Sequence, residues 1–270
     1  MRILNGSDLA GFIKQRQAHQ ARGLIQAYHV TPKLAIIQTV HTPIIDTYIK
    51  LKVKYGADIG IEVEPHVIDQ KDALETVKQL NADPTVHGII IQLPVAEPSQ
   101  TEELVDAVDP NKDVDGLGKN PAFDPATPTA VNWLLAGYNV ELRQKKIVIV
   151  GRGRLVGEPL SKILLDSGLN VEVADRRTED LKALTRSADV LITATGHPGL
   201  ITSDMIQPDA VVVDAGVATD AGKLVGDLAD DVRERSDLTI TPLKGGVGPL
   251  TVCALFENVL QSARRAASKE

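Results

Sequence analysis

Residues 146–159, KIVIVGRGRLVGEP, limit the folds open to this chain more than any other segment. A β-branched run from Ile147 to Val150 ends in glycines and is followed by an apolar helical pattern. This order predicts a buried parallel strand that leads into a phosphate-binding turn. Gly151 and Gly153 let the backbone approach a pyrophosphate, which the amino end of the next helix would attract. The spacing GxGxxxG is one residue longer than the usual dinucleotide fingerprint, so a tight turn without a ligand is the alternative at this point.

The rest of the second half alternates between strand and helix patterns. Five apolar runs are expected as strands, at residues 146–150, 170–174, 188–194, 210–214 and 238–241. Helical patterns follow the glycine turn and Thr178. This alternation favours a doubly wound parallel sheet of the Rossmann type. Residues 250–267 are helical in pattern, whereas residues 241–251, TPLKGGVGPLT, are too rich in glycine for an ordinary helix or strand.

The first half shows the same alternation on a smaller scale. Strands are expected at residues 33–39, 61–67 and 87–92, and helices at residues 7–22, 44–55, 71–80 and 101–108. This β-α-β-α-β order predicts a second parallel sheet with helices on its faces. Residues 111–128 are rich in Pro, Gly and Asp and are the best candidate for a linker.

Composition excludes several kinds of partner. The formal net charge of -7 argues against a nucleic-acid binder, because phosphate backbones are held mainly by surplus Lys and Arg. The single cysteine, Cys253, allows no disulfide within the chain, and the six histidines lack ligand spacing, so no metal site is expected. No segment has the ~18 apolar residues of a membrane span, and residues 1–15 lack a signal-peptide core. A cytoplasmic protein that binds no membrane is the expectation.

Ligands of parallel sheets gather beyond the carboxyl ends of the strands, and polar groups in the first half are expected there. Gln92 closes the run GIIIQLP. Tyr48 and Lys52 stand four residues apart on the helix after the first strand, and their shared face is either a site or a solvated surface. Asp113 and Asp115 occupy one turn, where they either bind a ligand or cap the turn.

Taken together, these segments resemble the bifunctional methylenetetrahydrofolate dehydrogenase/methenyltetrahydrofolate cyclohydrolase family. The matching pieces follow the family's order and span nearly the whole chain: YIKLK at 48–52, GIIIQLP at 88–94, KDVDG at 112–116, PATP at 125–128, VGRGRLVGEP at 150–159, VVDAGV at 212–217, GKLVGD at 222–227 and TPLKGGVGPLT at 241–251.

The resemblance implies two α/β domains and two reactions. Residues 1–120, completed by a C-terminal helix at 250–270, would bind the folate, and residues 121–249 would form the Rossmann-type domain that binds NAD(P). The cleft between the domains would be the active site. The implied activity is oxidation of 5,10-methylenetetrahydrofolate to the methenyl form, followed by hydrolysis to 10-formyltetrahydrofolate, in one-carbon metabolism and purine biosynthesis. A homodimer is also implied.

The same resemblance assigns roles to individual residues. Lys52 matches the family's catalytic lysine, Tyr48 the tyrosine that packs on the folate, Gln92 the partner of the lysine, and Asp115 the acid that holds the pterin. Further folate contacts fall on Leu93, Gly246 and Pro249, and cofactor contacts on Gly151, Arg152, Gly153, Arg176 and Val217.

Departures from the family pattern concern the folate site and the choice of cofactor. Ile45 stands where the family has a serine, and Lys244 stands where a proline is usual. After the second strand of the nucleotide domain the chain reads Ala-Asp-Arg-Arg, residues 174–177. Asp175 would bind ribose hydroxyls and disfavour a 2′-phosphate, whereas Arg176 and its arginine neighbours would attract that phosphate. We expect NADP, with NAD as the alternative.

Three other functions are consistent with parts of the sequence. The chain could be a family member that retains only the dehydrogenase, or a binding homologue with weak activity, because Ile45 departs from the pattern. A two-domain dehydrogenase of a small hydroxy or amino acid would also carry a lysine and an aspartate, but it leaves the KDVDG and GGVGP matches unexplained.

Overall fold

The computed structural model describes residues 1–216, 218–220 and 223–268, and these fall into two compact units. The glycine-turn unit consists of Met1–Ala10 and Thr127–Thr251. The Lys52 unit consists of Gly11–Ala126 and Val252–Glu270. Two long helices, α1 (Gly6–Tyr28) and α9 (Val247–Ala267), begin in the glycine-turn unit and continue in the Lys52 unit.

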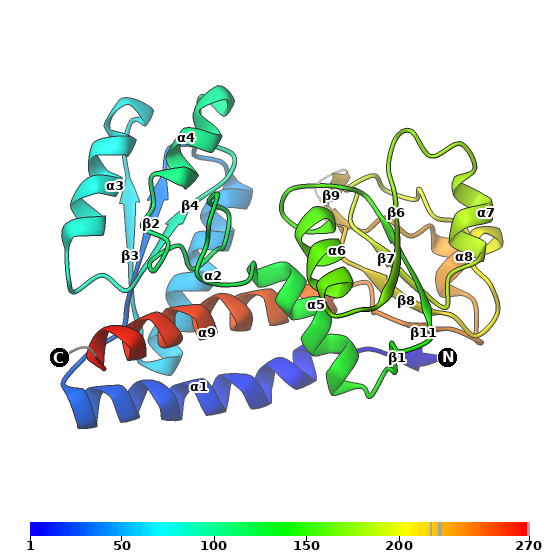
Figure 1. The fold of residues 1–270 in the computed structure, drawn as a ribbon, viewed down its shortest axis with the longest axis horizontal. Helices are drawn as coiled ribbons and strands as arrows, with labels where there is room; N and C mark the ends of the chain where they lie inside the picture. The colour runs from blue at the N-terminus through cyan, green and yellow to red at the C-terminus, as the bar shows by residue number, and fades with distance from the viewer. Residues whose placement is uncertain (217, 221–222, 269–270) are drawn as a thin grey trace. The chain divides into compact units, whose positions relative to one another are not determined.

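The Lys52 unit is built on a three-stranded parallel sheet in the order β3-β2-β4 (Figure 1). The central strand β2 (Lys33–Gln38) is flanked by β3 (Glu62–Val67) and β4 (Gly88–Ile91). Its side chains from Leu34 to Gln38 are all buried, because helices cover both faces of a parallel sheet. The connecting helices are α2 (Pro43–Ile59), α3 (Ala73–Ala82) and α4 (Thr101–Asp106), with 3₁₀ turns at Gln70–Asp72 and Pro98–Gln100.

Helix α2 has strong signals at both ends. The Thr42 side chain accepts a hydrogen bond from the Ile45 amide, and Pro43 occupies the first turn, where its missing N–H is not needed. The helix ends at Gly60, whose φ of 80° is the left-handed conformation that glycine adopts readily. These caps fix where α2 begins and ends after β2, and therefore which of its residues lie near the carboxyl edge of the sheet.

The glycine-turn unit is built on a six-stranded parallel sheet in the order β1-β11-β8-β7-β5-β6 (Figure 1). Its strands are β1 (Arg2–Ile3), β5 (Lys146–Val150), β6 (Asn170–Ala174), β7 (Val190–Thr193), β8 (Val211–Asp214) and β11 (Thr239–Ile240). The strand order reverses at β5, which lies between β6 and β7, and ligands of such sheets bind at this switch point. Helices α5 (Ala126–Gly137), α6 (Gly157–Asp166), α7 (Leu181–Arg186) and α8 (Asp230–Arg233), a 3₁₀ turn at Ser203–Met205 and the antiparallel hairpin β9 (Ala218–Asp220) with β10 (Lys223–Val225) complete the unit.

The predicted fold class, two α/β units with parallel sheets, is confirmed, and the expected strands are found within one or two residues of their predicted ends. Several elements of the described residues were not expected, among them the short strand β1, the helices α5 and α8 and the β9–β10 hairpin. The prediction for residues 241–251 was wrong in its second half, because α9 begins at Val247 and includes the segment Gly248–Thr251. The first ten residues group with the glycine-turn unit, because β1 pairs with β11 and the Ser7 amide bonds the Gly245 carbonyl.

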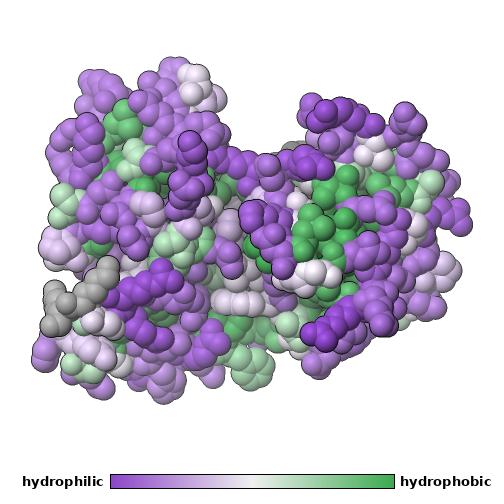
Figure 2. Space-filling model, in the orientation of Figure 1, coloured by the Kyte–Doolittle hydropathy of each residue, from purple (hydrophilic) through white to green (hydrophobic). Residues whose placement is uncertain are grey.

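The visible surface is hydrophilic over most of both units, and the largest group of apolar residues in this view lies on the glycine-turn unit (Figure 2). In the described part of the chain, no helix is long and apolar enough to cross a membrane.

Candidate active site

A lysine and a glutamine meet at the carboxyl edge of the Lys52 unit's sheet. Lys52, on α2, donates a hydrogen bond from Nζ to Gln92 Oε1 over 2.8 Å. Gln92 follows directly after β4, and its backbone amide continues the sheet by bonding the Ile37 carbonyl. The Gln92 amide nitrogen donates to the carbonyl of Leu93, 2.9 Å away, which orients the amide oxygen toward Lys52. The lysine is therefore held by a side chain that is itself fixed at both ends.

The electrostatics of this site favour neutral forms. Burial lowers the pKa of Lys52 below its ordinary value, and the negative charge of Asp115 partly opposes this shift. Burial raises the pKa of Asp115, Lys52 partly opposes that shift, and the nearby Asp113 carboxylate adds to it. Burial is the largest cause in both cases because an isolated charge loses its hydration there. A neutral amine at Lys52 is consequently more accessible than at a surface lysine.

The two aspartates of the KDVDG turn have different environments. Asp113 is buried, and its carboxylate accepts hydrogen bonds from the amides of Gly116, at 3.0 Å, and Gly118, at 2.8 Å. Asp113 thus makes the turn-capping contacts expected of an aspartate in such a turn. The half-buried Asp115 carboxylate accepts no hydrogen bond within the ranges that the structure describes. It is the carboxylate of this turn that is left for a ligand.

Helix α9 contributes a contact that the sequence analysis missed. The buried Asn258 donates from Nδ2 to the carbonyl of Val114, at 2.9 Å, and to that of Asp124, at 3.0 Å. These bonds tie the residue before Asp115 to the helix. The asparagine belongs to no motif and lies far from the turn in sequence, so no local signal identifies it.

The other expected folate contacts lie in different surroundings. Tyr48 is 38% exposed and precedes Lys52 by one turn of α2. Ile45 is 6% exposed, so the substitution of the family's serine changes the packed side of the helix. Gly246 and Pro249 lie in the glycine-turn unit, Gly246 buried before α9 and Pro249 half-buried in its first turn. Their contacts with a folate remain predictions.

A pocket of about 650 Å³ opens at the switch point of the six-stranded sheet. Its lining comes from the carboxyl ends of three neighbouring strands and the loops after them: Val150–Gly153 after β5, Ala174–Arg177 after β6, Ala194, Thr195 and His197 after β7, and Leu181 and Leu200. Gly151, Arg152, Gly153 and Arg176 are therefore brought together as expected, whereas Val217 lies outside the described residues.

The glycines of the turn have distinct roles. Gly151 has a φ of 108°, and a Cβ there would lie 2.5 Å from the Ala194 carbonyl oxygen. A Cβ on Gly157 would overlap the Gly151 carbonyl, so both positions need glycine for close backbone packing. A Cβ on Gly153 would meet nothing within 4 Å. The open space beside this backbone is what a dinucleotide phosphate needs, so the residues fit such a cofactor.

The acid at the end of β6 is neutralised by its neighbours. Asp175 lies 3.6 Å from Arg152 Nε and 3.8 Å from Arg177 Nη2, and it accepts a hydrogen bond from the Arg177 amide over 2.8 Å. Arg176 lines the pocket, is exposed, and forms no ion pair within the described residues. One guanidinium is thus left for a ligand after Asp175 has been paired.

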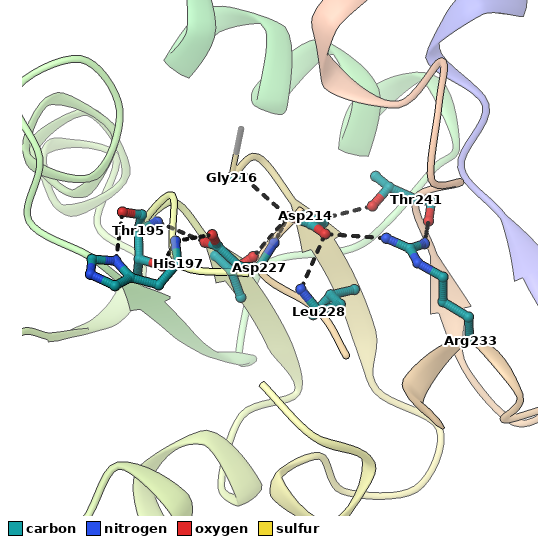
Figure 3. A network of polar contacts seen from close by, with 9 residues as sticks. Thr195, His197, Asp214, Gly216, Asp227, Leu228, Arg233 and Thr241 are labelled. Atoms are coloured by element: carbon teal, nitrogen blue, oxygen red, sulfur yellow. Dashed lines mark hydrogen bonds and ion pairs between the residues drawn. The ribbon is translucent and has the colours of Figure 1, made fainter. Parts of the chain in front are cut away.

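Two further aspartates of the glycine-turn unit, Asp214 and Asp227, form a network behind this pocket (Figure 3). Both lie in quoted motifs, VVDAGV and GKLVGD, but no role was predicted for either. Asp214 ends β8, and an acidic residue at the carboxyl end of a parallel strand was the available signal. Within the described ranges, no group of three or more His, Cys, Asp or Glu side chains could hold a metal ion.

A doubly wound sheet with a phosphate-binding turn, in one chain with a second parallel sheet whose helix α2 carries a half-buried lysine, is typical of two-domain nicotinamide-dependent dehydrogenases. Residues 4–115 match the catalytic domain of tetrahydrofolate dehydrogenase/cyclohydrolase, and residues 125–267 match its NAD(P)-binding domain. The chain therefore belongs to the tetrahydrofolate dehydrogenase/cyclohydrolase family. The predicted family, both enzyme activities and the nicotinamide cofactor are confirmed.

Relatives from distant organisms match over almost the whole chain. The chain is 38% identical over 278 residues to the bifunctional protein FolD of Bordetella avium, and 98% of each chain is covered. The crystal structure of the bifunctional enzyme FolD from Campylobacter jejuni has a TM-score of 0.92 at 33% identity and covers 98% of this chain and 99% of its own. The Trypanosoma brucei enzyme, solved with NADP and an inhibitor, has a TM-score of 0.88 at 30% identity and covers 97% of both chains.

Proposed function

We propose that Lys52, Gln92, Asp115 and Tyr48 carry the folate chemistry of this enzyme and that NADP is its preferred cofactor. The observation that supports the first part most strongly is the hydrogen bond between Lys52 Nζ and Gln92 Oε1, at a site where burial lowers the pKa of the lysine. Because its pKa is lowered, such a lysine is available as a base at lower pH than a surface lysine.

The first reaction needs positioning more than acid or base chemistry. The methylene carbon lies between two folate nitrogens, whose lone pairs stabilise the cation that remains after a hydride leaves. The nicotinamide, when bound, supplies the hydride acceptor. Asp115 would hold the amide and amino edge of the pterin with its unpaired carboxylate, and Tyr48 would pack on the folate and exclude water.

The second reaction needs a proton acceptor. Water attacks the cationic methenyl carbon, a C–O bond forms, and neutral Lys52 takes a proton from the water. The proton then passes to the folate nitrogen that leaves when its C–N bond breaks, and the remaining hydroxyl proton is released to solvent as the C=O bond of the formyl product forms. Gln92 supports this step because its amide oxygen accepts an N–H of Lys52 and thereby fixes the direction of the amine. The cationic substrate further favours the neutral lysine.

The choice of NADP is supported by the charges around Asp175. Its carboxylate is already paired with Arg152 and Arg177, so it is poorly placed to repel a 2′-phosphate, and Arg176 is left to bind one. Arg176→Ala should raise the KM for NADP by roughly tenfold or more, as expected for a lost charge-assisted contact, and change the KM for NAD little. Arg177→Ala is the comparison variant and should have a smaller effect, because the Arg177 side chain neutralises Asp175 and Arg152 still pairs with that carboxylate. A larger effect of Arg177→Ala would assign the phosphate to that residue instead.

The two activities are tested together in a paired assay. Purified protein is mixed with methylenetetrahydrofolate and either NADP or NAD, and reduced nicotinamide and the methenyl intermediate are recorded together. The expected result is faster reduction of NADP with little methenyl accumulation. Accumulating methenyl would indicate a dehydrogenase whose hydrolytic half is lost, and no reduction with either cofactor would contradict the proposal.

The setting is proposed from the family resemblance. We infer a cytoplasmic homodimer that supplies 10-formyltetrahydrofolate for purine biosynthesis. Light scattering of the purified protein tests the dimer, and a monomeric mass at micromolar concentration would contradict it.

A further inference from the structure

A buried carboxylate joins the hairpin of the glycine-turn unit to the wall of the nucleotide pocket. Asp227, which follows the β9–β10 hairpin, is fully buried. Its Oδ2 accepts a hydrogen bond from the Thr195 amide over 2.7 Å, and its Oδ1 accepts one from the His197 amide over 3.0 Å. Thr195 and His197 both line the pocket after β7. The carboxylate therefore holds two backbone groups of the pocket wall from behind.

Asp227 is in turn held by Asp214, at the other end of the hairpin. Asp214 Oδ1 accepts the Asp227 amide over 3.1 Å and the Gly216 amide over 3.1 Å. Arg233 Nη2 lies 3.2 Å from Asp214 Oδ2 and balances its charge. Figure 3 shows the resulting series of contacts, from Arg233 through Asp214 and Asp227 to the loop after β7.

Two glycines allow the carboxylates to pack so closely. A Cβ on Gly216 would overlap the Asp227 carboxylate, and a Cβ on Gly226 would overlap that of Asp214. The Asp227 carboxylate thus lies directly against the backbone of Gly216, and the Asp214 carboxylate lies directly against the backbone of Gly226. A side chain at either glycine would push a carboxylate away from the amides that it binds.

We propose that Asp227 is a positioning residue for the nucleotide, which sets the backbone of Thr195 to His197 before NADP binds. The proposal rests on this pocket being the nucleotide site of the proposed function. Without Asp227 the Thr195 N–H would lose its acceptor, and the His197 N–H would keep only the Thr195 Oγ1, 3.1 Å away, so a ligand would have to order the loop on binding. The His197 ring depends on the same loop, since its Nδ1 lies 3.1 Å from the Thr195 carbonyl oxygen.

The test compares Asp227→Asn with Asp189→Asn. Asp189 directly precedes β7, at the amino end of the strand whose carboxyl end leads to the pocket. Its carboxylate accepts the backbone amide of Lys146 over 2.8 Å and the side-chain amide of Gln207 over 3.3 Å. Both variants remove a charged acceptor of backbone or side-chain amides, but only Asp227 contacts the pocket wall. NADP affinity is measured by calorimetry without folate, beside the thermal midpoint and the rate of methenyl hydrolysis without nucleotide.

Asp227→Asn should weaken NADP binding by roughly tenfold, because an asparagine presents an NH₂ donor to one of two amide donors. The loss in dehydrogenase kcat/KM at low NADP should exceed any loss in hydrolysis by a similar factor. Asp189→Asn should lower the thermal midpoint without weakening NADP binding. Equal NADP affinity in Asp227→Asn and the unaltered enzyme, or equal weakening in both variants, would overturn the proposal. Failure of the unaltered enzyme to bind NADP would instead contradict the proposed function.

Hydrogen exchange of the unaltered enzyme gives a second test that does not depend on a variant folding. The amides of Thr195 and His197 should be protected before NADP is added, because they already bond a buried carboxylate. Fast exchange of both amides without NADP, followed by protection when NADP binds, would overturn the proposal.

Discussion

Lys52 and Asp115 have opposite charges, yet burial shifts the pKa of each toward its neutral form. The lysine pKa falls and the aspartate pKa rises, so the charged form of each group is less favoured than it would be at the surface. A catalytic site that must both attract a folate and accept a proton benefits from this balance. The bond from Lys52 to Gln92 adds direction to the amine.

Lys52→Met should separate the two reactions. Removal of the proton acceptor should lower the rate of methenyl hydrolysis by a factor of roughly 10²–10⁴, as for other general bases. Hydride transfer needs no base and should continue, so methenyl folate should accumulate as NADPH forms. Lys50→Met is the matched control, because Lys50 is exposed on the same helix. Equal loss of both activities in Lys52→Met would contradict the division of roles.

The pH–rate profile of methenyl hydrolysis should have a limb that rises with pH as Lys52 loses its proton, and the profile of hydride transfer should lack this limb. Because the pKa of Lys52 in the folded protein is below the ordinary 10.5, the neutral amine appears at lower pH than in a free lysine. Between the folded pKa and 10.5 the unfolded chain binds more protons, so this group also adds stability as pH rises through that window. Initial rates of methenyl hydrolysis, corrected for the uncatalysed reaction, check the limb. If hydrolysis by Lys52→Met still rose with pH in the same way, the limb would belong to another group.

At the scale of secondary-structure elements, the proposed folate site depends on how α9 holds the turn between α4 and α5. Asn258 satisfies the carbonyls of Val114 and Asp124, and Asp113 binds the amides that follow Asp115. The Asp115 turn is therefore fixed from both sides. The orientation of this turn is therefore set by the helix as well as by the loop.

Asn258→Ala should destabilise the fold by about 1–3 kcal/mol, because the buried Val114 carbonyl and the part-buried Asp124 carbonyl lose their donor. The looser turn should also raise the KM for folate in both reactions. Ser262→Ala is the matched control, since Ser262 lies one turn further along α9 and donates to the Asn111 carbonyl, away from Asp115. Chemical denaturation and folate titration measure the two effects, and an equal rise of the folate KM in both variants would contradict this role of Asn258.

The sequence predicted the elements with strong local signals and missed those stabilised from a distance. The buried strands β2, β4, β5 and β7 were found because runs of β-branched residues need no other information. The two residues of β1 carry no pattern, and only their pairing with β11 makes them a strand. Turn chemistry alone did not distinguish Asp113 from Asp115, and only the resemblance assigned the ligand role to Asp115; in the structure Asp113 is the one that binds amides of the turn. Asn258 and Asp227 act on residues far away in the chain, which periodicity and spacing cannot detect.

At the scale of the whole molecule, the chain passes between its two units three times, after Ala10, Ala126 and Thr251. Neither unit is a continuous segment. The Lys52 unit includes residues of α9 that are fully or almost fully buried, among them Phe256, Val259 and Leu260. The Phe256 ring lies 4.9 Å from that of Tyr55 on α2.

A fragment of residues 11–126 should therefore fail to fold cooperatively, because the apolar surface that α9 covers would face water. Addition of a peptide of residues 252–268 should restore helical content and a cooperative transition, measured by circular dichroism. A peptide with Phe256→Asp and Val259→Asp is the control and should restore neither. Cooperative unfolding of the fragment alone would contradict this dependence.

The three passages also set an order of events during synthesis. The segment 127–251 leaves the ribosome before residues 252–268 do, and the first ten residues that it needs have already emerged. The glycine-turn unit thus needs no residue after Thr251, although it is encoded mainly after the Lys52 unit. The Lys52 unit must wait for α9 with its apolar strands exposed, for several seconds at about 5–20 residues per second. We expect chaperones that hold apolar segments to bind the nascent chain between residues 33 and 126 during this interval.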